Sequence, residues 1–186
     1  MGTNSEFQFN GFNHLALVSS DMERTVDFYT NVLGMPLVKT LEIPGGAQHF
    51  FFDAGNNNSL AFFWFPDAPA AAPGIASAGE MPGVGDIVSA HGSMNHVAFD
   101  VPADKFDEYV EKLEEKGLEP SRVLNHDNSE TTVSEEMHPG VFVRSVYFRD
   151  PDGVVLEFAC WTAEFGPEDV AHAPANAKGE RAQPVG

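Results

Sequence analysis

The chain carries the same pattern twice, and this internal repeat restricts the folds that it can adopt. The stretch FNHLALVSSD begins at Phe12 and the stretch MNHVAFDVPA begins at Met94, with Asn-His at the same place in both. Apolar and polar residues alternate in each stretch, which predicts a strand. A module with one helix on one face of a short sheet cannot close a hydrophobic core alone, so the two copies are expected to pair.

Each of these strands is followed by an amphipathic helix and by further predicted strands. The first helix is expected to begin after its N-cap Asp21 and to end at Gly34, and the second is expected to end at Gly117. The further strands read LVKTLEI, QHFFFDAG and SLAFFWF in the first copy and SRVLNH, FVRSVYFRD and VVLEFAC in the second. The predicted fold class is therefore α+β, with two paired βαβββ modules that form a curved mixed sheet around a cavity.

Composition sets the borders of these modules. Apolar periodicity is weak around PDAPAAAPG and EMPGVGD, and also in the last part of the chain, which is rich in Ala, Pro and charge. We predict a leader at residues 1–10, a first module at 11–66, a linker or lid loop at 67–92, a second module at 93–162 and a flexible tail at 163–186.

The acidic charge limits the partners that the chain can have. The formal net charge is -18, with only 10 Lys and Arg residues. Such a surface repels phosphate backbones and anionic membranes, so neither a nucleic acid nor a membrane is an expected partner. No apolar run approaches the length of a membrane span. The single Cys160 excludes an internal disulfide framework and fits a reducing cytoplasm, which is the predicted location.

Glu157 stands in the apolar run VVLEFAC, where an unpaired buried carboxylate would be costly. The alignment of the two copies sets Ala61 against Glu157, so only the second copy carries the carboxylate. A metal ion could neutralise Glu157. The two repeated histidines, His14 and His96, form with this carboxylate a ligand set that suits Fe(II), Mn(II), Co(II) or Ni(II). The simpler alternatives are strand histidines satisfied by backbone carbonyls and a strand glutamate that faces water.

Residues 12–161 resemble the vicinal oxygen chelate superfamily, which includes glyoxalases, fosfomycin-resistance thiol transferases, bleomycin-binding proteins and extradiol ring-cleavage dioxygenases. The stretch DMERTVDFYTNVLGM is similar to the family's first helix, and each Asn-His is similar to its metal-ligand position. The resemblance implies that His14, His96 and Glu157 bind a metal ion in the cavity of the paired modules. Ala61 would leave a fourth ligand position empty.

Within this superfamily, HPGVFVRSVYFRDPDGVVLE (residues 138–157) is similar to the extradiol dioxygenase signature. That resemblance implies an Fe(II) enzyme, with Mn(II), Ni(II), Co(II) or Zn(II) as alternatives, which binds O2 and a catechol-like aromatic substrate as a homodimer or higher homo-oligomer. His138 is then the expected catalytic acid/base, and Tyr147 is the expected hydrogen-bond donor to a substrate oxygen. One position departs: Asn57 or Asn58 stands where these enzymes carry a further acid/base histidine, and an amide cannot shuttle a proton.

Two other functions remain open at this point. The first is a metal-dependent glyoxalase or thiol transferase without O2 chemistry, although the thiol transferases carry a threonine two residues after the first histidine, where this chain has Ala16. The second is a metal-free protein that binds a small molecule, as the bleomycin-binding members do. Those members lack the ligand set that is intact in this sequence.

Overall fold

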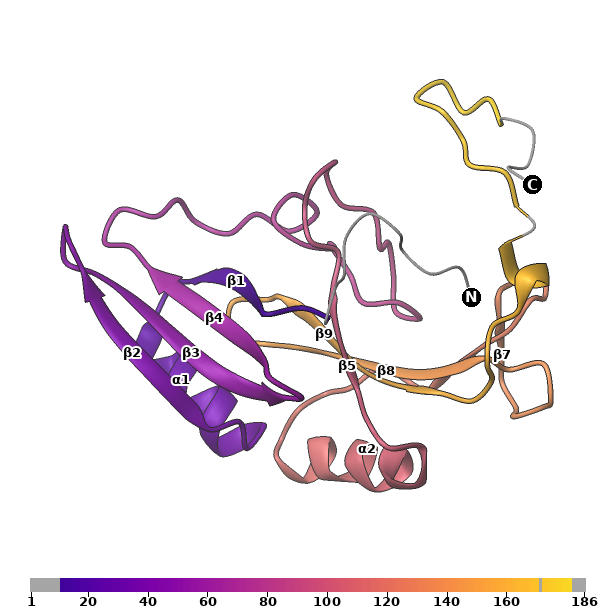
Figure 1. The fold of residues 1–186 in the computed structure, drawn as a ribbon, viewed down its shortest axis with the longest axis horizontal. Coiled ribbons are helices and arrows are strands. Elements are labelled where there is room, and N and C mark those ends of the chain that lie inside the picture. Colours follow the sequence, from indigo (N-terminus) through magenta and orange to yellow (C-terminus); the bar gives the residue numbers. More distant parts are fainter. Residues whose placement is uncertain (1–10, 171, 182–186) are drawn as a thin grey trace.

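A computed structural model describes residues 11–170 and 172–181, and these fold into two modules, each with its own sheet (Figure 1). The predicted leader lies outside the described residues. The first module contains β1 (His14–Ser19), α1 (Met22–Asp27), the π-helical η1 (Phe28–Val32), β2 (Leu37–Ile43), β3 (Ala47–Gly55) and β4 (Asn58–Trp64). The second contains β5 (Val97–Asp100), the 3-10 turn η2 (Ala103–Lys105), α2 (Phe106–Glu115), β6 (Leu124–His126), β7 (Val133–Ser134), β8 (Val143–Arg149) and β9 (Val155–Trp161).

The α+β class and the repeated strand-helix order are confirmed. The strand order is β1-β4-β3-β2 in one sheet and β5-β9-β8-β6-β7 in the other, so the expected single curved sheet is divided into two. In both sheets the opening strand pairs in parallel with the last strand of its module. The second module also has one short strand, β7, that the sequence pattern did not predict.

The first helix begins where its sequence predicts. The carboxylate of Asp21 accepts a hydrogen bond from the backbone N–H of Arg24 at 3.0 Å, which satisfies one of the free donors of the first turn. Tyr29, in η1, is fully buried, and its ring packs against Phe62 with 4.8 Å between the ring centroids. The apolar face of this helix therefore covers one face of the first sheet.

The Asn-rich stretch between β3 and β4 is a tight turn. Asn56 and Asn57 have φ angles of 50° and 59°, the left-handed pair that a two-residue type I′ hairpin requires. The Asn58 amide donates to the carbonyl oxygens of Gly55 and Asn56 at 3.2 and 3.0 Å. These asparagines, which stand at the position of an expected acid/base histidine, hold the hairpin turn together.

The predicted linker covers part of the second sheet, on the side away from α2. Ala78 and Met81 pack there against Tyr147 and Val155. The Arg149 guanidinium donates to the carbonyl oxygen of Gly79 at 2.7 Å, which fixes the backbone of this segment. Figure 1 shows the segment between β4 and β5 running over the sheets, opposite to α2. The face that carries the odd-numbered residues of β9 is therefore partly enclosed.

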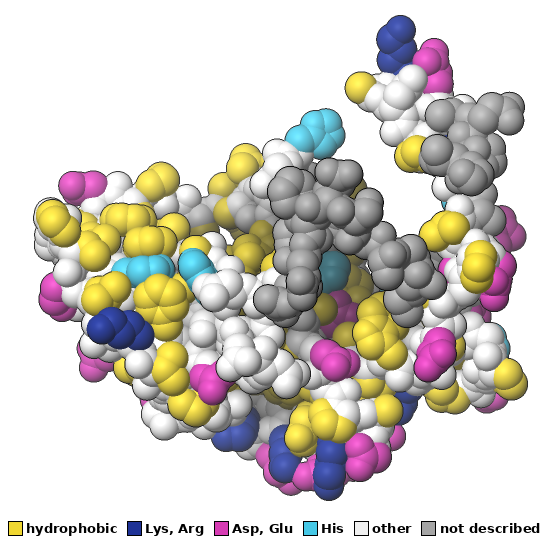
Figure 2. Space-filling view, viewed as in Figure 1, with side chains coloured by type: hydrophobic (Ala, Val, Ile, Leu, Met, Phe, Trp, Pro, Cys, Tyr) yellow, Lys and Arg dark blue, Asp and Glu magenta, His cyan; other side chains and the backbone are white. Residues whose placement is uncertain are grey.

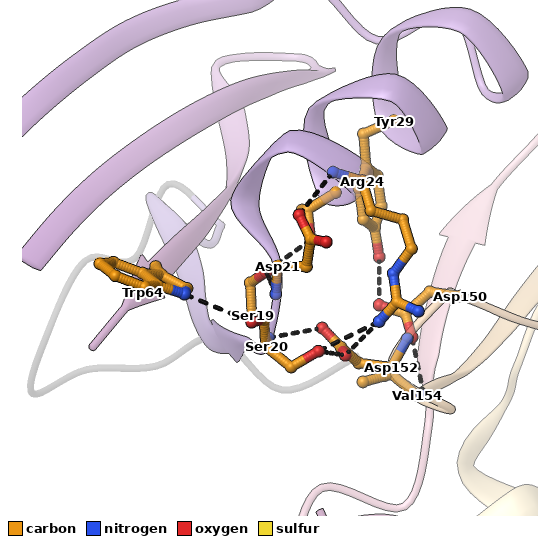
Figure 3. A network of polar contacts seen from close by, with 10 residues as sticks. Ser19, Ser20, Asp21, Arg24, Tyr29, Trp64, Asp150, Asp152 and Val154 are labelled. Carbon is orange, nitrogen blue, oxygen red and sulfur yellow. Dashed lines mark hydrogen bonds and ion pairs between the residues drawn. The ribbon is translucent and has the colours of Figure 1, made fainter. Parts of the chain in front are cut away.

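Polar contacts join the two modules at the turn between β8 and β9 (Figure 3). The Asp152 carboxylate pairs with Arg24 at 3.0 Å and accepts from the backbone N–H of Ser20 at 2.9 Å. The Tyr29 hydroxyl donates to Asp150 at 3.1 Å, and the other Asp150 oxygen accepts from the backbone N–H of Val154 at 2.8 Å. The Asp-Pro-Asp-Gly stretch of the predicted dioxygenase signature thus forms a structural joint between the modules.

The last part of the described chain contains one short helical turn. Within the predicted tail, residues 167–170 form η3 (Pro167–Val170), and the flexibility of that tail stays a prediction. Among the described residues, no helix is long and apolar enough to cross a membrane.

Candidate metal centre

His96 and Glu157 come together because β5 and β9 are parallel neighbours. Ala98 pairs with Glu157 in the register, and His96 immediately precedes β5 on the same face as Ala98. The distance between His96 Nε2 and Glu157 Oε2 is 3.0 Å, and the Glu157 side chain is 7% exposed. Two neighbouring ligands of an octahedral ion at about 2.1 Å lie about 3 Å apart. The spacing of this pair therefore suits two adjacent positions on one divalent ion.

Asn95 fixes which nitrogen of His96 carries a hydrogen. Its Nδ2 donates to the carbonyl oxygen of Ile87 at 2.7 Å, so its Oδ1 faces His96 Nδ1 at 3.0 Å. An amide oxygen only accepts, and Nδ1 must therefore be the donor. A neutral His96 then directs the lone pair of Nε2 at the Glu157 carboxylate. This arrangement requires a positive charge between the two atoms, either a proton or a metal ion.

The electrostatics of the pair favour a charged carboxylate and a protonated tyrosine. Burial by itself raises the pKa of Glu157, but the hydrogen bond and charge of His96, with hydrogen bonds from Ser145 and Tyr147, hold the pKa below its ordinary value. Tyr147 pairs with Glu157 across β8 and β9, and its ring centroid lies 5.7 Å from that of His96. Burial and the charge of Glu157 raise the pKa of Tyr147, so its hydroxyl keeps its proton and can donate it.

The structure does not bring His14 to this pair. His14 is exposed on β1, on the same face as Ala16 and Val18, and its Nδ1 lies 2.7 Å from Asn13 Oδ1. Each Asn-His of the repeat thus makes the same contact through Nδ1, and in the second copy Nε2 faces Glu157. Over residues 11–170 and 172–181, no group of three or more His, Cys, Asp or Glu residues is arranged to hold a metal ion. The predicted ligand set is divided between the two sheets.

The first sheet presents aromatic and aliphatic side chains around His14. The His49 ring stacks on Phe63 with 3.6 Å between the centroids, and Phe51 lies between His49 and His14, at 4.3 and 5.6 Å. Val18 is 51% exposed on the same face. In Figure 2 hydrophobic side chains surround histidines over this sheet. This exposed apolar face is the immediate environment of His14.

His138 lies elsewhere. Its Nε2 donates to Asp127 at 2.9 Å, and its Nδ1 accepts from the backbone N–H of Gly140 at 3.1 Å, so both ring nitrogens are engaged. The Ser129 hydroxyl and backbone N–H, with the bond from His138, hold the pKa of Asp127 below its usual value. His138 precedes β8 in the chain, and the structure gives it no contact with His96 or Glu157.

Asn95 positions the imidazole of His96. The sequence showed Asn95 only as part of the repeated Asn-His pair and gave it no role. Replacing Asn95 with Leu removes the acceptor of His96 Nδ1, and we expect the affinity for Mn(II) to fall about 10- to 100-fold. Asn95→Asp keeps an acceptor oxygen and is expected to restore most of that affinity. Metal titration followed by electron paramagnetic resonance measures both variants, and an unchanged affinity in Asn95→Leu would contradict the assignment.

Comparison with known proteins identifies the family of this chain. The sequence model of the Glyoxalase/Bleomycin resistance protein/Dioxygenase superfamily matches residues 11–158. The metallothiol transferase FosB of Lysinibacillus sphaericus is 29% identical over 152 residues, which cover 82% of this chain and 83% of FosB. The uncharacterised protein YwkD of Bacillus subtilis is 25% identical over 146 residues, which cover 78% of this chain and 92% of YwkD.

Solved structures share the fold. A glyoxalase family protein from Enterococcus faecalis superposes with a TM-score of 0.56 at 24% identity, over 81% of this chain and 98% of that one. A mutant of the fosfomycin resistance protein FosX from Listeria monocytogenes, solved with Mn(II) and 1S,2S-dihydroxypropylphosphonic acid, gives a TM-score of 0.53 at 18% identity, over 85% and 96%. Because the family model covers most of the sequence, the chain belongs to the Glyoxalase/Bleomycin resistance protein/Dioxygenase superfamily.

Proposed function

We propose that this protein is a divalent-metal enzyme that adds a nucleophile, such as a thiol or water, to a small molecule held through oxygen. The observation that carries the proposal is the pair of His96 Nε2 and Glu157 Oε2, 3.0 Å apart, with the histidine tautomer set by Asn95. The relative FosB is named a metallothiol transferase, which supports a metal-dependent transfer reaction without O2. Mn(II) is the ion that we would test first, since FosX was solved with it.

Each residue of the site has a defined task in this proposal. His96 and Glu157 hold the ion, and a bound divalent ion supplies Lewis-acid polarisation of a substrate oxygen. Tyr147 lies beside both residues, and its hydroxyl would donate a hydrogen bond to an oxygen of the substrate. His138 has no task here, since both of its ring nitrogens are already bonded.

We further propose that His14 of a second copy completes the ligand set. His14 is exposed on β1, and the apolar face around it would be buried against another chain. Three ligands from two copies would make the metal site and the dimer depend on each other. The same arrangement accounts for two matched histidines that lie on different sheets.

Mixing two inactive variants tests this arrangement. His14→Ala and Glu157→Gln are each expected to lose tight Mn(II) binding. The two variants are mixed in equal amounts, unfolded and refolded together. If the dimer shares its sites, half of the dimers contain one copy of each variant, and one of the two sites in such a dimer is intact. About a quarter of the wild-type number of sites is then restored. Equilibrium dialysis with metal analysis measures the recovery. A mixture that binds no more Mn(II) than the separate variants would exclude the shared site.

The reaction class is tested with an uncharged epoxide. The Mn(II)-loaded protein is expected to accelerate the addition of a thiol to styrene oxide, equally well with and without air. Thiol consumption followed over time is the measurement, and Glu157→Gln is the control. If metal loading fails even with careful anaerobic addition, a metal-free binding protein is the better conclusion.

A second candidate is an Fe(II) extradiol-type dioxygenase with a catechol-like substrate. The specific observation in its favour is Tyr147, a signature residue, beside both His96 and Glu157. Anaerobic loading with Fe(II), followed by catechol and air, distinguishes the two reactions. A yellow ring-cleavage product would favour the dioxygenase, and its absence from a fully Fe(II)-loaded protein would leave the addition reaction as the conclusion.

A further inference from the structure

The two modules meet in different ways at matching places of the repeat. The β8–β9 turn of the second module is bonded to Ser20 and Arg24, just after β1. The matching β3–β4 turn of the first module makes no hydrogen bond or ion pair with the segment after β5, as far as the described residues go. A cavity of about 500 Å³ lies there instead, with Asn56 and Asn58 on one side and Asp100 on the other.

This cavity reaches the candidate metal centre along one strand. Residues 96–100 all line it, so the cavity runs along β5 and meets the candidate metal centre at His96, whereas Glu157 and Tyr147 are not part of the lining. Its volume falls within the range of small-molecule sites. A molecule that occupies the cavity would therefore lie beside the imidazole of His96.

The walls of the cavity are mainly apolar and carry no fixed positive charge. Leu15, Leu60, Met94 and Phe99 contribute apolar surface. Asp100 is the charged residue of the lining, and no Lys or Arg belongs to it in the described part of the chain. Residues 1–10, 171 and 182–186, whose structure is not described, contain no Lys or Arg in the sequence.

The arginines closest to the metal centre in the chain are already engaged. Arg149 donates to two backbone carbonyl oxygens, those of Gly153 and Gly79, at 2.8 and 2.7 Å. Arg144 makes two hydrogen bonds to Asp107, at 3.3 and 2.8 Å. In the metal-free protein, an anionic ligand in the cavity would thus meet Asp100 and a net charge of -18 without a guanidinium or ammonium group to offset them.

We propose that this cavity binds the substrate as an uncharged molecule with an apolar, ring-sized body, and that it rejects phosphonates and other anions. The proposal rests on the proposed function, because it assigns a substrate class to a cavity that shares His96 with that site. The amide groups of Asn56 and the hydroxyl of Ser59 give polar contacts to one edge of such a ligand. In this respect the chain differs from FosX, which was solved with a phosphonic acid.

Two probes that differ only in charge test the proposal. We would measure the binding of 2-naphthol and 2-naphthol-6-sulfonate to the full chain by fluorescence titration, both without metal and with Mn(II). The uncharged naphthol is expected to bind at least about tenfold more tightly to the metal-free form, and the charge of bound Mn(II) is expected to narrow this difference. Because the metal-free form carries the test, a failure of the metal site leaves this result unaffected. Equal or tighter binding of the sulfonate to the metal-free form would overturn the proposal.

Variants of the lining locate the binding. Asp100→Asn is expected to narrow the difference between the two probes several-fold, whereas Asp104→Asn, an exposed carboxylate outside the lining, leaves it unchanged. Ala98→Trp fills the space beside His96 and should weaken naphthol binding at least about tenfold, while the exposed Ala163→Trp should not. Naphthol binding that is unchanged in Ala98→Trp would show that the probe binds elsewhere and would contradict the proposal.

Discussion

Replacing Glu157 with Gln lowers the affinity of the protein for Mn(II) by more than about 100-fold, the upper range for groups that only support a ligand. Gln has nearly the same shape as Glu, so the packing of β9 against β8 is retained while the charge is lost. The affinity is measured by Mn(II) titration under electron paramagnetic resonance. The exposed Glu164→Gln, which also removes one negative charge, is the matched control.

The same variant also separates a metal ligand from a structural charge. With a metal role, Glu157→Gln loses the rise in unfolding temperature that Mn(II) gives the wild type. With a purely structural role, the metal-free variant loses the contact of Glu157 with the partly exposed His96, but Mn(II) changes the unfolding temperature of the variant and of the wild type equally. Differential scanning calorimetry with and without Mn(II) distinguishes these results, and retained full occupancy would remove Glu157 from the ligand set.

Asp150→Asn makes the protein more stable at neutral pH by up to about 3 kcal/mol. Burial raises the pKa of Asp150 from an ordinary value of 3.8 to about 6. The folded state therefore holds the proton more tightly than the unfolded state, and this contribution is complete below about pH 4. It is lost as the pH rises through about 6. Asn keeps an oxygen for the backbone N–H of Val154 and an NH2 group that can donate to the Tyr29 oxygen.

Denaturant unfolding from pH 4.5 to pH 8 measures this effect. The difference in unfolding free energy between Asp150→Asn and the wild type is expected to grow with pH and to level off above pH 6. Asp152→Asn is the control, because it breaks a pair with the half-exposed Arg24 and costs about 0–1 kcal/mol. A difference that is constant across the series would mean that Asp150 is not the titrating group.

The repeat predicted the modules well because each module is built from local patterns. Alternation and helical periodicity identified the strands and both helices, and Asp21 marked the start of α1 as expected. The pairing of His96 with Glu157 followed as well, since both residues belong to one module. The separation of His14 from them depends on how the modules pack, and no local pattern contains that information. The bond from Asn95 to Ile87 likewise depends on the path of a long loop.

The dioxygenase signature illustrates a different limit. His138 matches that signature by spacing, but Asp127, eleven residues earlier, holds its Nε2. The Asp-Pro-Asp-Gly part matches because the turn into β9 needs it, with Asp150 accepting backbone N–H groups and Gly153 at a φ of 83°. Spacing alone does not distinguish a turn from a catalytic site. The relative FosB is named a metallothiol transferase, which favours the alternative without O2 chemistry over ring cleavage.

The bonded turn at Asp152 ties the second module to the end of β1, a strand that also reaches the cavity. Ser20 follows β1 directly, and Leu15, five residues earlier and about 17 Å along an extended chain, lines the cavity. Both modules line the cavity, so its shape depends on how firmly they are attached to each other. Substitutions at Ser20 or Arg24 would loosen that attachment and lower ligand affinity, although neither residue lines the cavity.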